Sequence, residues 1–344
     1  MSDPLHLTRR SLLGGIAASA LLPALPLPAF AQGDPLPSWN ETPTRRAILD
    51  LVAAVTTEGG PGYVRPEDRI ATFDQDGTTW VEQPMYAQGL FAFDRLAEIA
   101  PHHPEWKGEE PFKAILTGDH AAMAKLTEKE LLEIVAVTHA GMSTADFESI
   151  VADWLPKSSN PALKRGPVTA LVYKPMLEVM AYLRANGFRT YLVTGGGQEF
   201  VRVYSEKVYG IPPEQVVGSS IQTKYELKDG KPELLREPKI FFVDDGPGKA
   251  QGIDLFIGKR PQIAFGNSDG DREMLEWTTA GDGRRLGLLV LHDDKDREFA
   301  YGPANGLPDS KIGTFSQALM DEAKDRSWQV ISMKDDWKTI FAGS

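Results

Sequence analysis

The sequence predicts an α/β fold whose core is a parallel sheet with helices on both faces. In its second half, short apolar strands alternate with helices, the pattern of parallel strands joined by crossover helices. A first strand, residues 68–73, is separated from this alternation by residues 84–155, which show only helical periodicity. We therefore expect an inserted all-helical cap, residues 82–165, between two parts of the core, 46–81 and 166–344.

Residues 1–31 have the three regions of an export signal. Arg9 and Arg10 precede a short apolar run, and a small-x-small cleavage pattern ends at Ala31. The paired arginines resemble a twin-arginine signal, which predicts a periplasmic or secreted protein. The apolar run is too short for a membrane span, which takes about 20 apolar residues. We therefore expect no stable membrane anchor after cleavage.

The mature chain is expected to begin with a Pro-rich linker, residues 32–45, followed by a helix over residues 46–57. Inside the insertion, helical periodicity predicts three helices, over residues 85–100, 127–141 and 144–155. Thr127 and Glu130 stand three residues apart at the start of the second helix. Their spacing predicts a capping box.

After the insertion, the alternation continues towards the C-terminus. Strands are expected at residues 189–193, 240–243, 262–265, 287–291 and 328–332. Helices are expected at residues 174–186, 198–209, 248–256, 271–278 and 315–324. Before the second of these strands, Asp229 and Gly230 separate two extended runs. This dipeptide favours a tight two-residue turn and predicts a hairpin over residues 222–235.

Composition limits the possible classes of function. The 344-residue chain has a net charge of −11, whereas general nucleic-acid binders present a basic surface. The chain contains no cysteine, which excludes disulfides, thiolate metal sites and cysteine nucleophiles. No pattern in the sequence predicts an oligomeric state.

Two carboxylates stand at the end of the first strand, in the run Asp74-Gln75-Asp76-Gly77-Thr78. Ligands of an open α/β sheet bind at the carboxyl ends of its strands. Two acids in one turn repel each other, so they need a cation or a shared proton, and Mg²⁺ suits their oxygens. Here Asp74 can attack phosphorus as a nucleophile, and Asp76 can protonate the leaving group.

The alternative for this run is an exposed turn, because Asp and Gly are common in turns. A calcium loop of the helix-loop-helix type is excluded by spacing. Its sixth and twelfth positions require Gly and Glu, but counted from Asp74 they hold Thr79 and Met85.

Two later loops supply groups that can bind phosphate. The run Thr194-Gly195-Gly196 lies between a strand and a helix, where a hydroxyl and glycine N–H groups form an anion site or, alternatively, a flexible turn. Lys249 opens a helix, where its charge opposes the helix dipole. It is either a counter-charge for phosphate and Asp74 or an exposed lysine.

A third loop supplies groups that can bind a cation. Asn267 and Asp271 stand four residues apart after another strand, where both can face a cation or form a capped turn. Together, the four loops contain a nucleophile, an anion clamp, a lysine and a group that completes a metal site. Phosphoryl transfer requires mainly positioning and charge neutralisation, which this set supplies.

These motifs resemble the haloacid dehalogenase superfamily, specifically its phosphatases with a helical cap of the phosphoserine phosphatase type. Residues 74–78 resemble the first motif, Thr194-Gly195 the second, Lys249 the third and residues 266–271 the fourth. The match spans residues 69 to about 276. The resemblance implies a Rossmann-like core and a helical cap that closes over the substrate.

The resemblance also implies a role for each site residue. Asp74 would form an aspartyl-phosphate, and Asp76 would protonate the leaving oxygen and then activate water. The catalytic residues would be Asp74, Asp76, Thr194 and Lys249. The residues that bind phosphate would include Thr78, Gly195 and Gly196. The Mg²⁺ ligands would come from Asp74, the Asp76 backbone, Asn267 and Asp271, the last either as a ligand or close behind the ion.

The sequence departs from the family pattern in two places. Asn267 stands where the family usually has Asp, so the metal site loses one negative charge. We therefore expect weaker Mg²⁺ binding, and tighter binding by Asn267→Asp. Glu82 matches an early glutamate of the phosphoserine phosphatase cap only approximately, which argues against phosphoserine as the substrate.

We therefore predict an exported, Mg²⁺-dependent phosphomonoester hydrolase that acts on a small phosphorylated metabolite, with no nucleic-acid partner. Two alternatives remain open. A phosphotransferase or phosphomutase would use the same residues on the same fold. A non-catalytic periplasmic protein would bind phosphate or a cation at the same loops.

Overall fold

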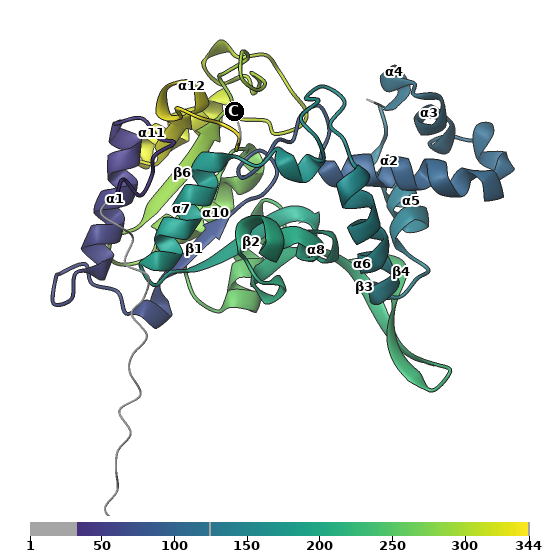
Figure 1. Ribbon diagram of the computed structural model, residues 1–344, viewed down its shortest axis with the longest axis horizontal. Coiled ribbons are helices and arrows are strands. Elements are labelled where there is room, and N and C mark those ends of the chain that lie inside the picture. The colour runs from purple at the N-terminus through teal and green to yellow at the C-terminus, as the bar shows by residue number, and fades with distance from the viewer. Residues whose placement is uncertain (1–32, 124, 343–344) are drawn as a thin grey trace, which may run out of the picture. The chain divides into compact units, whose positions relative to one another are not determined.

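Seven strands form one sheet in the computed structural model, which describes residues 33–342 apart from residue 124 (Figure 1). Their order is β4-β3-β2-β1-β5-β6-β7, and every pair of neighbours is parallel except β3 and β4. This confirms the predicted fold class. The strands are Ile70–Phe73 (β1), Arg189–Gly197 (β2), Val216–Lys228 (β3), Lys231–Phe242 (β4), Ile263–Gly266 (β5), Leu286–Leu291 (β6) and Gln329–Ser332 (β7).

The chain divides into two units after residue 34, and the fold is that of the second unit, described over residues 35–342 without residue 124. The predicted export signal, residues 1–31, lies outside the described residues. Within the part of the chain that the structure describes, no helix has the length and apolar character needed to cross a membrane.

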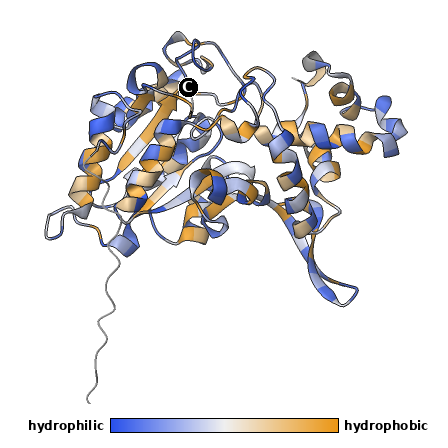
Figure 2. Cartoon of the chain, viewed as in Figure 1, coloured by the Kyte–Doolittle hydropathy of each residue, from blue (hydrophilic) through white to orange (hydrophobic). Residues whose placement is uncertain are grey.

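Helices cover both faces of the sheet because its strands alternate their side chains between two apolar clusters. In β5, Ile263 and Phe265 join one cluster and Ala264 joins the other. Figure 2 shows hydrophobic residues along the strands between the helices. The first cluster packs against α1 (Pro43–Thr56), α7 (Lys174–Ala185) and α8 (Gln198–Tyr209). The second packs against α10 (Arg272–Thr279) and α11 (Gln317–Asp325).

Between β1 and α7, the residues that the structure describes form only helical elements, as predicted. They are α2 (Ala87–Ile99), α3 (Phe112–Thr117), α4 (His120–Met123), α5 (Glu128–His139) and α6 (Thr144–Trp154), with short 3₁₀ turns. The capping box of Thr127 and Glu130 is present at the start of α5. All five helices fall within residues 82–165, although these limits remain a prediction as domain boundaries.

The predicted hairpin is longer than expected and extends to the inserted helices. Asp229 and Gly230 both have positive φ, 51° and 77°, as the tight turn requires. Further along the hairpin, the Arg236 carbonyl accepts from the Gly141 N–H, and the Arg236 N–H donates to the Met142 carbonyl, both at 2.9 Å. Figure 1 shows the hairpin of β3 and β4 beside α5 and α6.

The prediction of a separate parallel strand at residues 240–243 is wrong. Residues 240–242 form the end of β4, which pairs antiparallel with β3 at the edge of the sheet. As a result Phe241 is 71% exposed, unlike a residue of a central strand. The apolar run predicted a strand but carried no information on the direction of pairing.

Most of the segment expected to be a linker, residues 32–45, is part of the folded unit, which begins at residue 35. Leu36 and Trp39 are fully buried, and the Trp39 ring meets Trp337 edge-on at 6.0 Å. The first helix begins at Pro43, with Thr42 as its N-cap, three residues earlier than expected. Most of this Pro-rich segment therefore belongs to the core unit, in which the short helix α12 (Met333–Asp336) is the last helix of the described residues.

Candidate active site

The central strand of the sheet places Asp74 at the carboxyl edge. The strand β1 lies between β2 and β5, so the loops that follow all three strands meet beside Asp74. The Asp74 N–H donates to the Phe265 carbonyl at 2.8 Å, which fixes the residue against β5. Asp74 is only 6% exposed, so the alternative of a solvent-exposed turn is wrong.

Lys249 links two of the predicted site carboxylates. Its Nζ lies 2.5 Å from Asp74 Oδ1 and 2.5 Å from Asp271 Oδ1. It is buried near the start of α9 (Pro247–Gly252), which excludes the alternative of an exposed lysine. Burial opposes its charge, but Asp271 and Asp74 together raise the pKa of Lys249. Burial and the charge of Asp271 raise the pKa of Asp74, although Lys249 opposes this rise.

Asp271 uses both of its carboxylate oxygens inside the protein. Oδ1 contacts Lys249, while Oδ2 accepts from the backbone N–H groups of Asn267 at 2.9 Å and Ser268 at 3.0 Å. These contacts shape the loop after β5 and hold the ammonium group in place. Of the two expected roles for Asp271, they favour a position close behind the ion over direct ligation.

Thr78 lies between the nucleophile and the fourth motif. Its fully buried hydroxyl is 3.0 Å from Asn267 Oδ1 and 3.3 Å from Asp74 Oδ2. The two side-chain oxygens expected to bind a cation, Asp74 Oδ2 and Asn267 Oδ1, therefore lie close to one point, the Thr78 hydroxyl. The Nδ2 of Asn267 points away from this point and donates to Glu82 Oε1 at 2.8 Å.

Glu82 is a buried carboxylate behind the site. Its Oε1 also accepts from the Tyr301 hydroxyl at 2.7 Å. Burial raises the pKa of Glu82 to about 7, and His292 opposes this rise. Its carboxylate is bonded inside the protein, because Glu82 is only 2% exposed.

Asp76 has the environment of a group that exchanges protons near neutral pH. Its Oδ1 accepts from the Trp80 indole N–H at 2.7 Å. Burial raises the pKa of Asp76 to about 6, while the Trp80 hydrogen bond and Lys249 lower it. Asp76 lies near the glycine loop, because a Cβ built on Gly196 would be 3.8 Å from its Oδ2.

The glycine loop is an irregular end of β2. The pairing of β2 with β3 shifts between Thr194 and Gly197, so Gly195 and Gly196 bulge from the strand. The Gly196 N–H donates to Thr194 Oγ1 at 3.0 Å. Helix α8 begins directly after Gly197, which gives this loop the expected position at a helix N-terminus.

Sequence reasoning did not find a chain of hydrogen bonds from the glycine loop into the inserted helices. Gln88, in the first turn of α2, accepts from the Gly197 N–H at 2.6 Å, and its Nε2 lies 3.1 Å from His139 Nε2. His139 Nδ1 lies 2.7 Å from the Thr138 hydroxyl. Burial, with the charge of Arg236, lowers the pKa of His139 to about 3, so its ring is neutral. No sequence motif marks these residues.

A second buried cluster supports the turn that follows Asp76. His292 Nε2 donates to the Gly77 carbonyl at 2.8 Å, and its Nδ1 lies 3.0 Å from Glu298 Oε2. Burial lowers the pKa of His292, but the charge and hydrogen bond of Glu298 oppose burial, and overall the pKa of His292 is raised. The cluster joins residues more than 200 positions apart, and no local pattern predicts it.

The donor set around Asp74 fits a hard divalent cation. Two buried carboxylates, of Asp74 and Asp271, share one ammonium group, which leaves excess negative charge. Within the described residues, no three His, Asp or Glu side chains are grouped to hold a metal. The ligands would therefore include the Asn267 amide and the Asp76 backbone carbonyl besides Asp74. Such oxygens suit Mg²⁺, which keeps several waters and takes few carboxylates.

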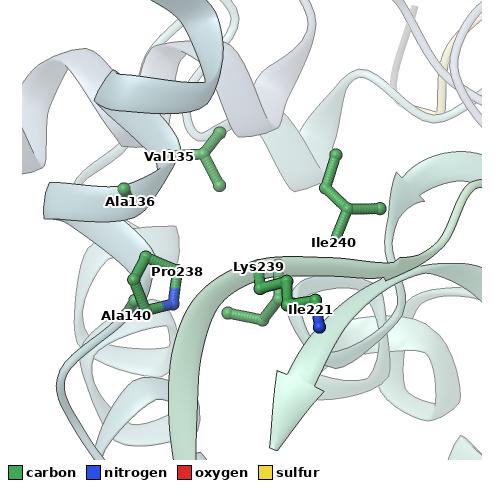
Figure 3. A pocket seen from close by; sticks show the side chains of 7 residues that line it. All are labelled: Val135, Ala136, Ala140, Ile221, Pro238, Lys239 and Ile240. Carbon is green, nitrogen blue, oxygen red and sulfur yellow. The ribbon is translucent and has the colours of Figure 1, made fainter. Parts of the chain in front are cut away.

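The predicted site is separate from the apolar hollow shown in Figure 3. This hollow, of about 200 Å³, lies between α5 and the hairpin, and no predicted site residue lines it. Its lining is formed by Val135, Ala136, Ala140, Ile221, Pro238, Lys239 and Ile240.

Several solved structures are similar in fold, all at low sequence identity. A conserved protein of unknown function from Anaerococcus prevotii DSM 20548 is 16% identical, with a TM-score of 0.49; the alignment covers 72% of this chain and 85% of that one. A phosphoserine phosphohydrolase-like protein from Francisella tularensis is 16% identical, with a TM-score of 0.36, and the coverage is 65% and 88%. No curated protein matches the sequence.

The sequence profile of the haloacid dehalogenase-like hydrolases matches residues 71–276, from β1 to α10, which is more than half of the chain. This range contains all the residues predicted for the site, from Asp74 to Asp271. The chain belongs to the haloacid dehalogenase-like hydrolase family.

Proposed function

We propose that this chain is a Mg²⁺-dependent phosphomonoester hydrolase that works through an aspartyl-phosphate. The observation that carries the proposal is the buried arrangement of Asp74, Lys249 and Asp271, with an acid of raised pKa two residues after the nucleophile. A hydrolase that expels an alkoxide needs such an acid. Mg²⁺, held by Asp74, the Asp76 carbonyl and Asn267, would neutralise charge on the phosphoryl oxygens.

The first half of the reaction transfers the phosphoryl group to the protein. An Asp74 carboxylate oxygen attacks phosphorus, the bond from phosphorus to the ester oxygen breaks, and Asp76 gives its proton to that oxygen. Lys249 keeps the Asp74 carboxylate oriented and lowers the repulsion between carboxylate and phosphate. The hydroxyl of Thr194, at the start of the glycine loop, would bind a phosphoryl oxygen.

The second half releases phosphate. Asp76, now ionised, takes a proton from water, and the resulting hydroxide attacks phosphorus. The bond from phosphorus to the Asp74 oxygen breaks, which restores the carboxylate and the protonated Asp76. The raised pKa of Asp76, about 6, allows both protonation states near neutral pH.

Turnover of p-nitrophenyl phosphate tests this proposal. We expect the mature chain to release p-nitrophenol with Mg²⁺ and to lose activity with EDTA. Asp74→Asn should lose at least about a thousandfold in kcat, as expected for removal of a nucleophile, and a cooperative thermal transition should show that this variant is folded at the assay temperature. Tight reversible phosphate binding without turnover would instead identify a binding protein. A panel of phosphate esters, with alcohols as acceptors, would separate hydrolysis from phosphoryl transfer.

We also propose that the substrate is a small phosphorylated metabolite outside the cytoplasm. The support is the twin-arginine-like leader, residues 1–31, with its cleavage pattern at Ala31. Arg9→Lys together with Arg10→Lys should keep the protein in the cytoplasm of a host that has this export route. Fractionation and N-terminal sequencing test this, with the unaltered chain, cleaved after Ala31, as the control. Equal export of both forms would contradict it.

A further inference from the structure

We propose that Glu82 is a positioning residue for the cation site. It fixes the amide of Asn267 from behind and supplies the negative charge that the fourth motif lacks. The inference rests on the proposed Mg²⁺-dependent function and adds to it a residue outside the four motifs.

The contacts of Asn267 decide which end of its amide faces Asp74. Glu82 Oε1 accepts from Nδ2 at 2.8 Å, while the Thr78 hydroxyl lies 3.0 Å from Oδ1. The same hydroxyl lies 3.3 Å from Asp74 Oδ2. An amide has one donor end and one acceptor end, and a carboxylate only accepts. Glu82 therefore turns the amide oxygen towards Asp74, as a cation ligand requires.

The backbone leaves space for this pair at two glycines. A Cβ on Gly77, which has a φ of +75°, would lie 2.1 Å from Asn267 Nδ2 and 2.3 Å from Glu82 Oε1. A Cβ on Gly313 would lie 1.7 Å from Glu82 Oε1. Any other residue at either position would push the carboxylate away from the amide.

The space that Glu82 fills does not by itself explain why a carboxylate is buried at this position. The side chain is 2% exposed, and its Oε1 is contacted by two neutral groups, of Asn267 and Tyr301. The nearby His292 is already bonded to Glu298 at 3.0 Å. A buried carboxylate without a direct cation is costly, and glutamine would fill the same space. Burial alone disfavours the ionised carboxylate, and a divalent cation on the far side of the amide would compensate its charge and favour that form.

This arrangement reverses one expectation from the sequence. Asn267→Asp alone would place a second carboxylate against Glu82 and remove the N–H group that now separates them. We therefore expect this variant to bind Mg²⁺ no more tightly than the unaltered chain. The proposed cation site needs one carboxylate, at position 267 or at position 82, and a carboxylate at both positions would cause repulsion.

A charge-exchange series measures this directly. The mature chain and its variants are titrated with Mg²⁺ by calorimetry and with Mn²⁺ by electron paramagnetic resonance. Glu82→Gln should weaken binding about tenfold or more, the range for residues that support metal ligands. The double variant Glu82→Gln with Asn267→Asp should recover the affinity of the unaltered chain. Tyr301→Phe removes a hydrogen bond from the same oxygen without changing charge, and should cost clearly less.

Apo-protein melting temperatures show which variants are folded, so that the affinities are compared among folded chains. The proposal is overturned if folded Glu82→Gln keeps its affinity, if the double variant fails to recover, or if the unaltered chain binds neither ion. If Glu82→Gln does not fold, the double variant compared with Asn267→Asp decides: without a gain in affinity, the proposal fails. Phosphatase activity is assayed separately. Turnover with an unchanged Glu82→Gln affinity rejects this inference alone, whereas absent turnover rejects the proposed function.

Discussion

At the scale of single residues, the site is a balance of buried charges. Lys249 lies 2.5 Å from carboxylate oxygens of both Asp74 and Asp271, and all three side chains are nearly inaccessible to solvent. Removing one partner from such a cluster leaves uncompensated charge in a medium that solvates it poorly. Stability and catalysis therefore depend on the same three residues.

Lys249→Met should lower the free energy of unfolding by about 3–5 kcal/mol, because it leaves two buried carboxylates without an ammonium group. Adding Asp271→Asn should recover part of this loss, since one of the two charges is removed. Urea unfolding in EDTA, which excludes compensation by a cation, gives both values. Equal stability of Lys249→Met and the unaltered chain would show that the ion pairs do not stabilise the fold.

The pKa of Asp76 predicts the pH dependence of the first half-reaction. Burial raises this pKa to about 6, and the proton is needed to expel the leaving oxygen. Above this pH the protonated fraction falls, so kcat/KM for an alkyl phosphate should decrease about tenfold per pH unit. p-Nitrophenyl phosphate should show a shallower decrease because its leaving group needs less protonation. A flat profile for the alkyl ester would contradict the role of Asp76.

At the scale of elements, the inserted helices are bound to the catalytic loop by the hydrogen-bond chain through Gln88 and His139. This chain joins α2 and α5 to the N-terminus of α8. Its direction requires a neutral imidazole, with Nδ1 donating to Thr138 and Nε2 accepting from Gln88. Protonation of His139 would replace the acceptor with a donor and break the link.

The pKa of His139 therefore predicts a slope of stability with pH. Its pKa is about 3 in the folded chain, against about 6.5 when exposed. Between these values the unfolded chain binds more protons, so stability is lost as the pH falls, by about 1.4 kcal/mol per unit. His139→Gln should lack this contribution. Urea unfolding of both proteins at two pH values below 6.5 measures the change in the free energy of unfolding with pH. The same change with pH in both proteins would contradict the prediction.

The elements also show what the sequence could predict. The strand before Asp74 and the capping box of Thr127 were predictable because their signals are local: an apolar run, and two residues three positions apart. The antiparallel end of β4 was not, because an apolar run such as residues 240–243 has no direction of pairing. Trp39 was assigned to a linker because its partner, Trp337, lies at the other end of the chain.

At the scale of the whole molecule, the sheet topology assembles the site from distant residues. Motifs at the ends of neighbouring strands could be combined in advance, because parallel strands end at one edge. This rule accounts for Asp74, Thr194 and Asn267. It does not predict the position of Glu82, whose partner Tyr301 lies 219 positions later in the sequence. Such contacts depend on side-chain packing and not on strand order, so only the folded structure shows them.

The central claim is that Asp74 carries phosphorus during turnover. The most direct measurement is to quench the reaction with sodium borodeuteride, which reduces an acyl phosphate to a deuterated alcohol, and to map the product by mass spectrometry. We predict deuterated homoserine at position 74, present only when substrate and Mg²⁺ are added together and absent from Asp74→Asn. Continued phosphate release with position 74 unmodified, or with the label at another residue, would contradict the account.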